Sequence, residues 1–197
     1  MNEVVNKLSE YPIQFFEDQE SWENWLEENH DSSSGIRLQI AKKQSGVVSI
    51  SYEEALESAL CYGWIDSKKE TFDEKTWLQR FTPRGAKSIW SKVNKEKAEL
   101  FIKIGRMKSS GMKAIEIAKK NGQWDGAYEP QSSATIPEDF VIELNKKSIA
   151  KAFFETLDSR NRYAILFRIK SAKKQETRMK RIQQFIMMLE KGEKIYQ

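Results

Sequence analysis

Cysteine and histidine are almost missing from this chain of 197 residues, which contains one of each, Cys61 and His30. A single cysteine excludes an internal disulfide framework. Structural zinc sites usually take four Cys or His ligands, which this chain cannot supply. Catalysis by a Ser–His or Cys–His pair would have to use His30. We expect neither a metal nor a cofactor.

Long apolar runs are also lacking. No stretch approaches the roughly 20 residues that span a bilayer. The opening MNEVVNKLSEYP has no basic region followed by an apolar one, as a signal peptide would. The dinucleotide, P-loop and HExxH fingerprints do not occur either. We therefore expect a cytoplasmic protein, with a non-enzymatic role favoured because no catalytic motif is recognisable.

Charge is distributed unevenly, although the net charge is only +4. Residues 1–35 contain nine acids and one base, whereas residues 80–120 contain twelve bases and three acids. Residues 160–181 contain nine bases and one acid. Such basic windows are typical of contact with an anionic partner, above all nucleic acid. The alternative is a solvated surface, with the acidic N-terminal segment folded over a basic face.

Hydrophobic periodicity predicts a mixed α+β domain in residues 1–124. We expect strands at 11–16, 36–41 and 47–50, a helix at 19–29, and a helix that begins at the capping box Ser51–Glu54. Residues 64–71 and 76–82 indicate a β-hairpin around a polar turn. After Pro83 the pattern is helical, with an N-cap expected at Asn94 and a second helix from 109 or 110, of which Met112 faces inward.

The segment 125–137 contains two prolines and small polar residues, which is typical of a linker. Residues 138–197 contain one glycine and no proline, and predict helices at 138–146, 148–157, 159–170 and 174–191. A unit of 60 residues is marginally stable alone, so we expect it to pack on the first domain. The fold class is α+β, with a small antiparallel sheet and helices followed by an all-helical C-terminal part.

Tryptophan and basic residues gather around the predicted hairpin and the helix that follows it. Aromatic faces stack bases, and guanidinium groups bind phosphate or carboxylate. Asp66 on the first hairpin strand is expected to reach Arg80 on the second, as an acid/base beside an anion clamp or as a structural ion pair. In that second case the tryptophans seal the core. The candidates are Trp64, Asp66, Arg80, Arg84, Lys87, Trp90 and Lys92.

The basic start of the last predicted helix is the second candidate. Basic residues are unfavourable at a helix N-terminus, because the helix dipole is positive there. A phosphate held between the first amide groups and Arg178 would explain them. A solvated basic face is the alternative.

Four strings resemble the YdeI/OmpD-associated family, labelled bacteriocin-protection proteins. They are SYEEALESALCYGWIDSKKE, RFTPRGAKSIWSKVNKEKAE, GRMKSSGMKAIEIAKKNGQW and IKSAKKQETRMKRIQQFIMMLEKG. The resemblance runs from about Phe16 to Gly192. It implies a bacterial cytoplasmic protein with an α+β front and a helical tail, and no known reaction. Where the family has Arg-Arg-Pro, this chain has Arg84-Gly85-Ala86. The matching positions add Arg106, Arg178 and Arg181 to the candidates.

Three functions remain open at this point. The first is a non-enzymatic binding protein for an anionic partner, possibly nucleic acid, in stress or bacteriocin tolerance. The second is a small-molecule enzyme or sensor with a pocket around Trp64, Asp66 and Arg80. The third is a protein-interaction module whose acidic N-terminal segment docks a basic partner.

Overall fold

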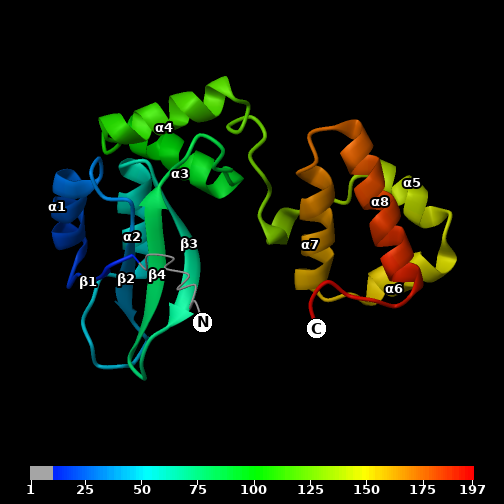
Figure 1. The fold of residues 1–197 in the computed structure, drawn as a ribbon, viewed down its shortest axis with the longest axis horizontal. Coiled ribbons are helices and arrows are strands. Elements are labelled where there is room, and N and C mark those ends of the chain that lie inside the picture. The colour runs from blue at the N-terminus through cyan, green and yellow to red at the C-terminus, as the bar shows by residue number, and fades with distance from the viewer. Residues whose placement is uncertain (1–10) are drawn as a thin grey trace, which may run out of the picture. The chain divides into compact units, whose positions relative to one another are not determined.

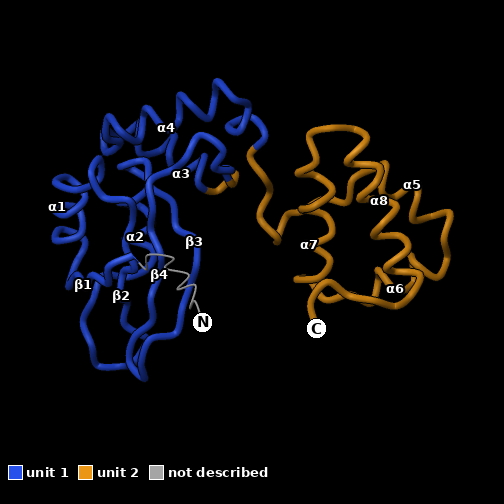
Figure 2. Tube along the Cα trace, in the orientation of Figure 1, with its two compact units in different colours: residues 1–90, 94–126 blue, residues 91–93, 127–197 orange. Residues whose placement is uncertain are grey.

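The computed structural model describes residues 11–197. Residues 1–10, with which the acidic segment begins, lie outside the described residues. The described chain forms two compact units, shown in different colours in Figure 2. Unit 1 comprises residues 11–90 and 94–126, and unit 2 comprises residues 91–93 and 127–197. In the described part, no helix is both long enough and apolar enough to cross a membrane. The packing of one unit on the other stays a prediction.

Unit 1 is built on a mixed sheet with the strand order β1-β2-β4-β3 (Figure 1). The strands are β1 Ile13–Phe15, β2 Ile36–Ala41, β3 Trp64–Thr71 and β4 Thr76–Pro83. The helices are α1 Gln19–Asn29, α2 Tyr52–Cys61, α3 Lys92–Lys103, which begins in residues 92–93 of unit 2, and α4 Ser109–Lys120. This confirms the α+β class, with one difference. The sheet is not wholly antiparallel, because β1 pairs parallel with β2 through the crossover helix α1.

The first two helices begin where local side chains satisfy their free amide groups. The Asp18 side chain accepts a hydrogen bond from Ser21 N–H (2.8 Å) at the start of α1. The predicted capping box of α2 is present, since Ser51 and Glu54 bond reciprocally. His30 lies at the C-cap of α1, with its Nδ1 2.8 Å from the Leu26 carbonyl oxygen. The single histidine is thereby engaged in ending a helix.

One face of the sheet carries the core of unit 1. Ile36, Leu38 and Ile40 alternate with half-buried residues along β2, as the sequence predicts, and all three are buried. Phe81 on β4 lies opposite Ile36 and packs against Trp22 of α1, with ring centroids 5.8 Å apart. The Trp22 indole donates to the Ala55 carbonyl of α2 (3.1 Å). Burial of these large side chains stabilises the unit through the hydrophobic effect.

The predictions of one strand and of one helix start in unit 1 are wrong. Residues 47–50 form no strand, although the Ile50 N–H bonds the Phe16 carbonyl (3.0 Å) just after the end of β1. Helix α3 begins at Lys92 and not after Asn94, since the Lys92 N–H is satisfied by the Tyr128 carbonyl (2.8 Å). Local capping signals therefore missed a partner that lies far away in sequence.

Unit 2 is helical, as predicted, and each helix begins and ends close to its expected bounds. The helices are α5 Glu138–Asn145, α6 Ser148–Thr156, α7 Ser159–Lys170 and α8 Gln175–Glu190, after the short 3-10 helix Gln131–Ser133. Phe140, Phe154, Ile165, Ile182 and Leu189 belong to one buried cluster. Each helix contributes an apolar stripe to this cluster, which gives the unit a core of its own.

Candidate anion-binding surface

Two tryptophans meet where the loop after β4 lies beside the end of α4. Trp90 and Trp124 are 2% and 5% exposed, and their rings contact edge to face with centroids 4.9 Å apart. The Arg84 N–H bonds the Gly63 carbonyl (2.9 Å), and the Asn121 side chain bonds the Ala86 carbonyl. These bonds fix the loop against the rest of unit 1.

Basic side chains surround this tryptophan pair. The Arg84 guanidinium lies 4.0 Å from the ring centroid of Trp90. The ammonium groups of Lys95 and Lys119 lie 5.3 and 5.6 Å from the ring of Trp124. Cations are attracted to the faces of aromatic rings. With the exposed Lys87 of the same loop, these residues form what we call the basic tryptophan surface: Arg84, Lys87, Trp90, Lys95, Lys119 and Trp124.

The lysines of this surface have no counter-charge within the described residues. No carboxylate there pairs with Lys87, Lys95 or Lys119. An ammonium group without a nearby carboxylate keeps its full attraction for an external anion. The surface therefore has the charge that an anionic partner requires.

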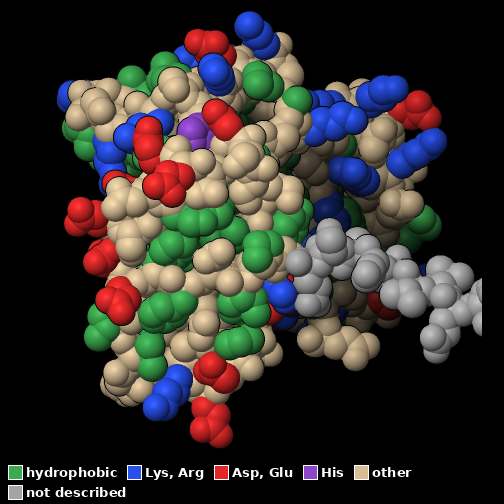
Figure 3. Space-filling view, turned by 60° about the vertical axis from the view of Figure 1, so that its left-hand side comes forward, with side chains coloured by type: hydrophobic (Ala, Val, Ile, Leu, Met, Phe, Trp, Pro, Cys, Tyr) green, Lys and Arg blue, Asp and Glu red, His purple; other side chains and the backbone are tan. Residues whose placement is uncertain are grey.

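Other bases of the same window are neutralised internally. Arg106 pairs with Glu23 of α1 (3.0 Å) and with Glu57 of α2 (3.3 Å). Lys97 pairs with Glu57 (2.7 Å), and Lys108 pairs with Glu27 of α1 (3.2 Å). Figure 3 shows acidic and basic side chains side by side around the single histidine. The acidic helix thus covers part of the basic window, which is the alternative considered above, but not the basic tryptophan surface.

The environment of Glu23 shows how tightly this internal pairing is built. Burial opposes ionisation of Glu23, but hydrogen bonds from Ser58 (2.7 Å) and Arg106 outweigh it and lower the pKa of Glu23. The buried Ser58 also accepts from Gln19 (3.0 Å). Arg106 is consequently a structural residue that joins its own loop to α1 and α2.

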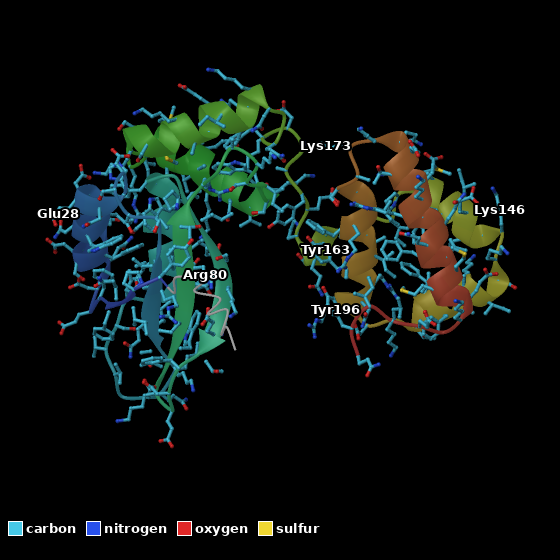
Figure 4. All side chains as sticks on the ribbon, in the orientation of Figure 1. Glu28, Arg80, Lys146, Tyr163, Lys173 and Tyr196 are labelled. Carbon is cyan, nitrogen blue, oxygen red and sulfur yellow. The ribbon has the colours of Figure 1, made fainter. Side chains whose placement is uncertain are left out.

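The proposed partnership of Asp66 with Arg80 is wrong. Residues that are neighbours along a strand point to opposite faces of a sheet. Asp66 lies opposite Phe81, on the face that α1 and α2 cover, and accepts a hydrogen bond from Tyr52 (2.8 Å). Arg80, labelled in Figure 4, lies opposite Arg37, on the other face, where it pairs with Glu70 (3.4 Å).

Trp64 is a core residue and not part of a pocket with Asp66 and Arg80. It is 1% exposed and contacts Trp22 and Trp25 edge to face. Its indole donates to the His30 carbonyl (3.3 Å). With Arg80 on the opposite face of the sheet, the geometry removes the pocket that the enzyme or sensor hypothesis required.

The remaining candidates lie in unit 2 and are held by internal bonds. Lys92 and Lys170 both bond Glu129 (3.1 and 2.7 Å), and Lys170, then Lys92, lowers the pKa of that carboxyl to about 2. Arg178 is bidentate to Asp139 (2.5 and 2.8 Å). Arg181 donates to the Arg168 carbonyl and to Ser171 (3.1 Å). The expectation of a phosphate on Arg178 is wrong, because Asp139 already occupies its donors.

Trp124, Lys95 and Lys119 are the members of the surface that the sequence analysis missed. Lys95 and Lys119 are 24 positions apart and lie on different helices, so no local spacing connects them. The available signal was Trp124 itself, the last tryptophan before the predicted linker. A large aromatic at the end of a unit often seals its core, and here it joins two segments.

Cys61 offers no reactive thiol in the folded chain. It is 2% exposed, and burial raises the pKa of its thiol to about 11. At pH 8 the thiolate fraction at a pKa of about 11 is about a hundredfold lower than at the ordinary thiol pKa of about 9. We therefore expect a thiol reagent such as Ellman's reagent to react at least about a hundredfold more slowly with the folded protein than with the protein in guanidinium chloride. Equal rates in the two states would contradict this burial.

Within residues 11–197 no group of three or more His, Cys, Asp or Glu side chains is placed to hold a metal ion. Asp66 and Arg80, the pair considered for acid/base chemistry and anion binding, lie on opposite faces of the sheet. The arrangement that remains is a basic surface over a buried tryptophan pair.

Comparison with known families covers both units. Residues 14–114, just over half of the chain, match the sequence model described as a domain of unknown function, DUF8412. The chain belongs to the DUF8412 family. Residues 133–192 match the family described as bacteriocin-protection, YdeI or OmpD-associated. This confirms the resemblance for the C-terminal part, whereas the expected span from Phe16 to Gly192 is divided between two family models. No curated protein matches the chain, and no solved structure matches it either.

The DUF8412 match ends inside α4, so the basic tryptophan surface begins within this match and extends beyond its end. Arg84, Trp90 and Lys95 lie within the DUF8412 domain, and Lys119 and Trp124 lie between the two matched regions. Neither description names a ligand or a reaction.

Proposed function

We propose that this protein is a non-enzymatic binding protein for a polyanion, foremost a nucleic-acid strand, and that unit 1 contacts it through the basic tryptophan surface. The observation that carries the proposal is the contrast within one basic window. Arg106, Lys97 and Lys108 are neutralised by glutamates of α1 and α2. Lys87, Lys95 and Lys119 have no carboxylate partner within the described residues.

The burial of the two tryptophans determines which part of such a partner the surface would recognise. Trp90 and Trp124 are too buried to stack on bases, so they act as a rigid support beneath the basic side chains and orient them. The anion is then recognised through its phosphates, which position a strand and carry no sequence information. We therefore expect binding that depends little on base sequence and strongly on salt.

This proposal is tested by titrating labelled oligothymidylate and oligoadenylate into the full chain and following fluorescence anisotropy at low and at moderate salt. We expect both oligonucleotides to bind with affinities within about fivefold of each other, and both to weaken as salt rises. Absence of binding to either strand at low salt would overturn the proposal.

A role in stress or bacteriocin tolerance is part of the same proposal. The description of the C-terminal family, bacteriocin protection, supports it. Binding of a polyanion in the cytoplasm would be the molecular event behind such tolerance. A protein partner docked on the acidic N-terminal segment has less support, because Glu23 and Glu27 of that segment are already paired with Arg106 and Lys108.

A further inference from the structure

A cavity of about 340 Å³ lies along one side of α7 in unit 2. Five of its lining residues follow helical spacing, at positions i, i+3, i+4, i+7 and i+8, and therefore share one face of the helix. They are Arg160, Tyr163, Ala164, Phe167 and Arg168. Tyr196, from the C-terminal segment, lines the cavity as well (Figure 4). The small Ala164 lies at the middle of this stripe, with an aromatic ring and a guanidinium on each side along the chain.

The aromatic lining is held in place by hydrogen bonds outside the cavity. The side chain of Asn161, which is 2% exposed, donates to the Tyr196 carbonyl (3.0 Å) and accepts from the Tyr196 N–H (2.8 Å). The Tyr163 hydroxyl donates to the Glu129 carbonyl (2.8 Å). Phe167 contacts the rings of both Tyr163 and Tyr128, with centroids 5.9 and 5.2 Å apart. The cavity is therefore formed before any ligand enters, which lowers the entropy cost of binding.

The charge of this cavity is positive and uncompensated. The Arg160 guanidinium stacks on the ring of Tyr196 at 4.3 Å, and Arg168 lies 5.8 Å from the same ring. Arg168 also holds the pKa of the Tyr196 phenol below its usual value by hydrogen bonding. The lining residues include no acid. Within the described part of unit 2, Lys170 and Arg178 are paired with carboxylates, but Arg160 and Arg168 are not.

From this geometry we infer a binding site in unit 2 for a ligand that carries a flat ring and an anionic group, as a nucleoside monophosphate does. The ring packs among Tyr163, Phe167 and Tyr196, which give it aromatic faces and edges. The phosphate is bound by the guanidinium groups at the two ends of the stripe, whose planar donors suit phosphate oxygens. The volume is at the lower end of the range for small-molecule pockets, which matches a ligand of one ring system and one phosphate.

The same chemistry occurs in a free nucleotide and in the terminal nucleotide of a strand. The site is independent of the basic tryptophan surface, because its lining residues all lie in unit 2. Its failure would therefore leave the proposed function of unit 1 untouched.

The test is isothermal titration of the full chain with adenosine 5′-monophosphate, adenosine, inorganic phosphate and a 5′-phosphorylated oligoadenylate. The variants are Arg160→Gln and Arg168→Gln. Lys173→Gln serves as the matched control, since Lys173 is an exposed base of the same window outside the cavity. A phenylalanine at position 196 would keep the ring, so Tyr196→Leu is the variant that removes it.

We expect the monophosphate to bind at least about tenfold more tightly than adenosine or phosphate alone, because only it uses both the rings and the guanidiniums. Arg160→Gln, Arg168→Gln and Tyr196→Leu should each weaken it about tenfold, and Lys173→Gln should not. Binding of the oligonucleotide alone, weakened by the same three variants, identifies the end of a strand as the source. Absence of binding by both ligands, or monophosphate binding that the three variants leave unchanged, would overturn the inference. So would absence of monophosphate binding together with oligonucleotide binding that the three variants leave unchanged, since such binding belongs to the basic tryptophan surface of unit 1.

Discussion

Replacing Gly111 by alanine is expected to lower the free energy of unfolding of unit 1 by about 3 kcal/mol, the upper part of the range for an overpacked site. A Cβ at Gly111 would lie 2.2 Å from the Cys61 carbonyl oxygen and 2.5 Å from the Met107 sulfur. The Cys61 carbonyl is fixed by the Lys108 N–H (3.1 Å). Backbone at the start of α4 therefore lies directly on backbone at the end of α2, and a movement of the Met107 side chain would not relieve the contact with the Cys61 carbonyl.

Gly85→Ala is the matched control for that substitution. A Cβ at Gly85 would meet no atom within 4 Å, and its φ is not positive, so the change should stay within about 0.5 kcal/mol of the parent protein. Urea unfolding followed by tryptophan emission measures both variants, because all six tryptophans lie in unit 1. Equal unfolding midpoints for Gly111→Ala and Gly85→Ala would contradict the close approach of α2 and α4.

Removing the three lysine charges of the basic tryptophan surface is expected to weaken binding to a single strand about a hundredfold at moderate salt. This estimate takes about 1 kcal/mol for each lost ammonium–phosphate contact, with each 1.4 kcal/mol worth tenfold in affinity. The triple variant Lys87→Gln, Lys95→Gln, Lys119→Gln leaves Arg84 and the tryptophan pair intact. Its unfolding curve should therefore match that of the parent protein, and the measurement is anisotropy with the same labelled strand.

A second triple variant separates a local effect from a change in net charge. Lys43, Lys75 and Lys151 are exposed, and all lie outside the basic tryptophan surface. Changing these three to glutamine removes the same total charge, so the long-range attraction falls equally. We expect at most about a threefold loss of affinity for this control. A loss equal to that of the first triple variant would mean that net charge alone attracts the strand.

Elements with strong local signals could be predicted from the sequence. The capping box of Ser51 and Glu54 placed the start of α2, and the glycine- and proline-free C-terminal part gave four helices close to their observed bounds. What could not be predicted depends on distant partners. The parallel pairing of β1 with β2 is one such case, and the burial of Gly111 in place of the exposed Met112 is another. Neither feature produces a local pattern in the sequence, because each depends on which elements pack together in the folded unit.

Only the part of the candidate site that is contiguous in sequence could be predicted, for the same reason. Arg84, Lys87 and Trp90 are close in sequence and were found by composition, whereas Trp124 and Lys119 join them only after folding. Asp66 and Arg80 were misassigned because strand register decides which face each residue occupies. The sequence overstated how many basic residues are available to an anionic partner, because Glu23, Glu57 and Asp139 neutralise Arg106 and Arg178 across large sequence separations.

The most direct test of the central claim is the salt dependence of strand binding by the parent protein and by the triple variant at Lys87, Lys95 and Lys119. The logarithm of the binding constant falls with the logarithm of salt concentration, by about 0.7 for each phosphate neutralised on a single strand. If the three lysines contact phosphates, the slope of the variant is shallower by about 2, and the control triple keeps the parent slope. Equal slopes for the parent protein and the variant would show that these lysines do not contact the strand, and would contradict the account.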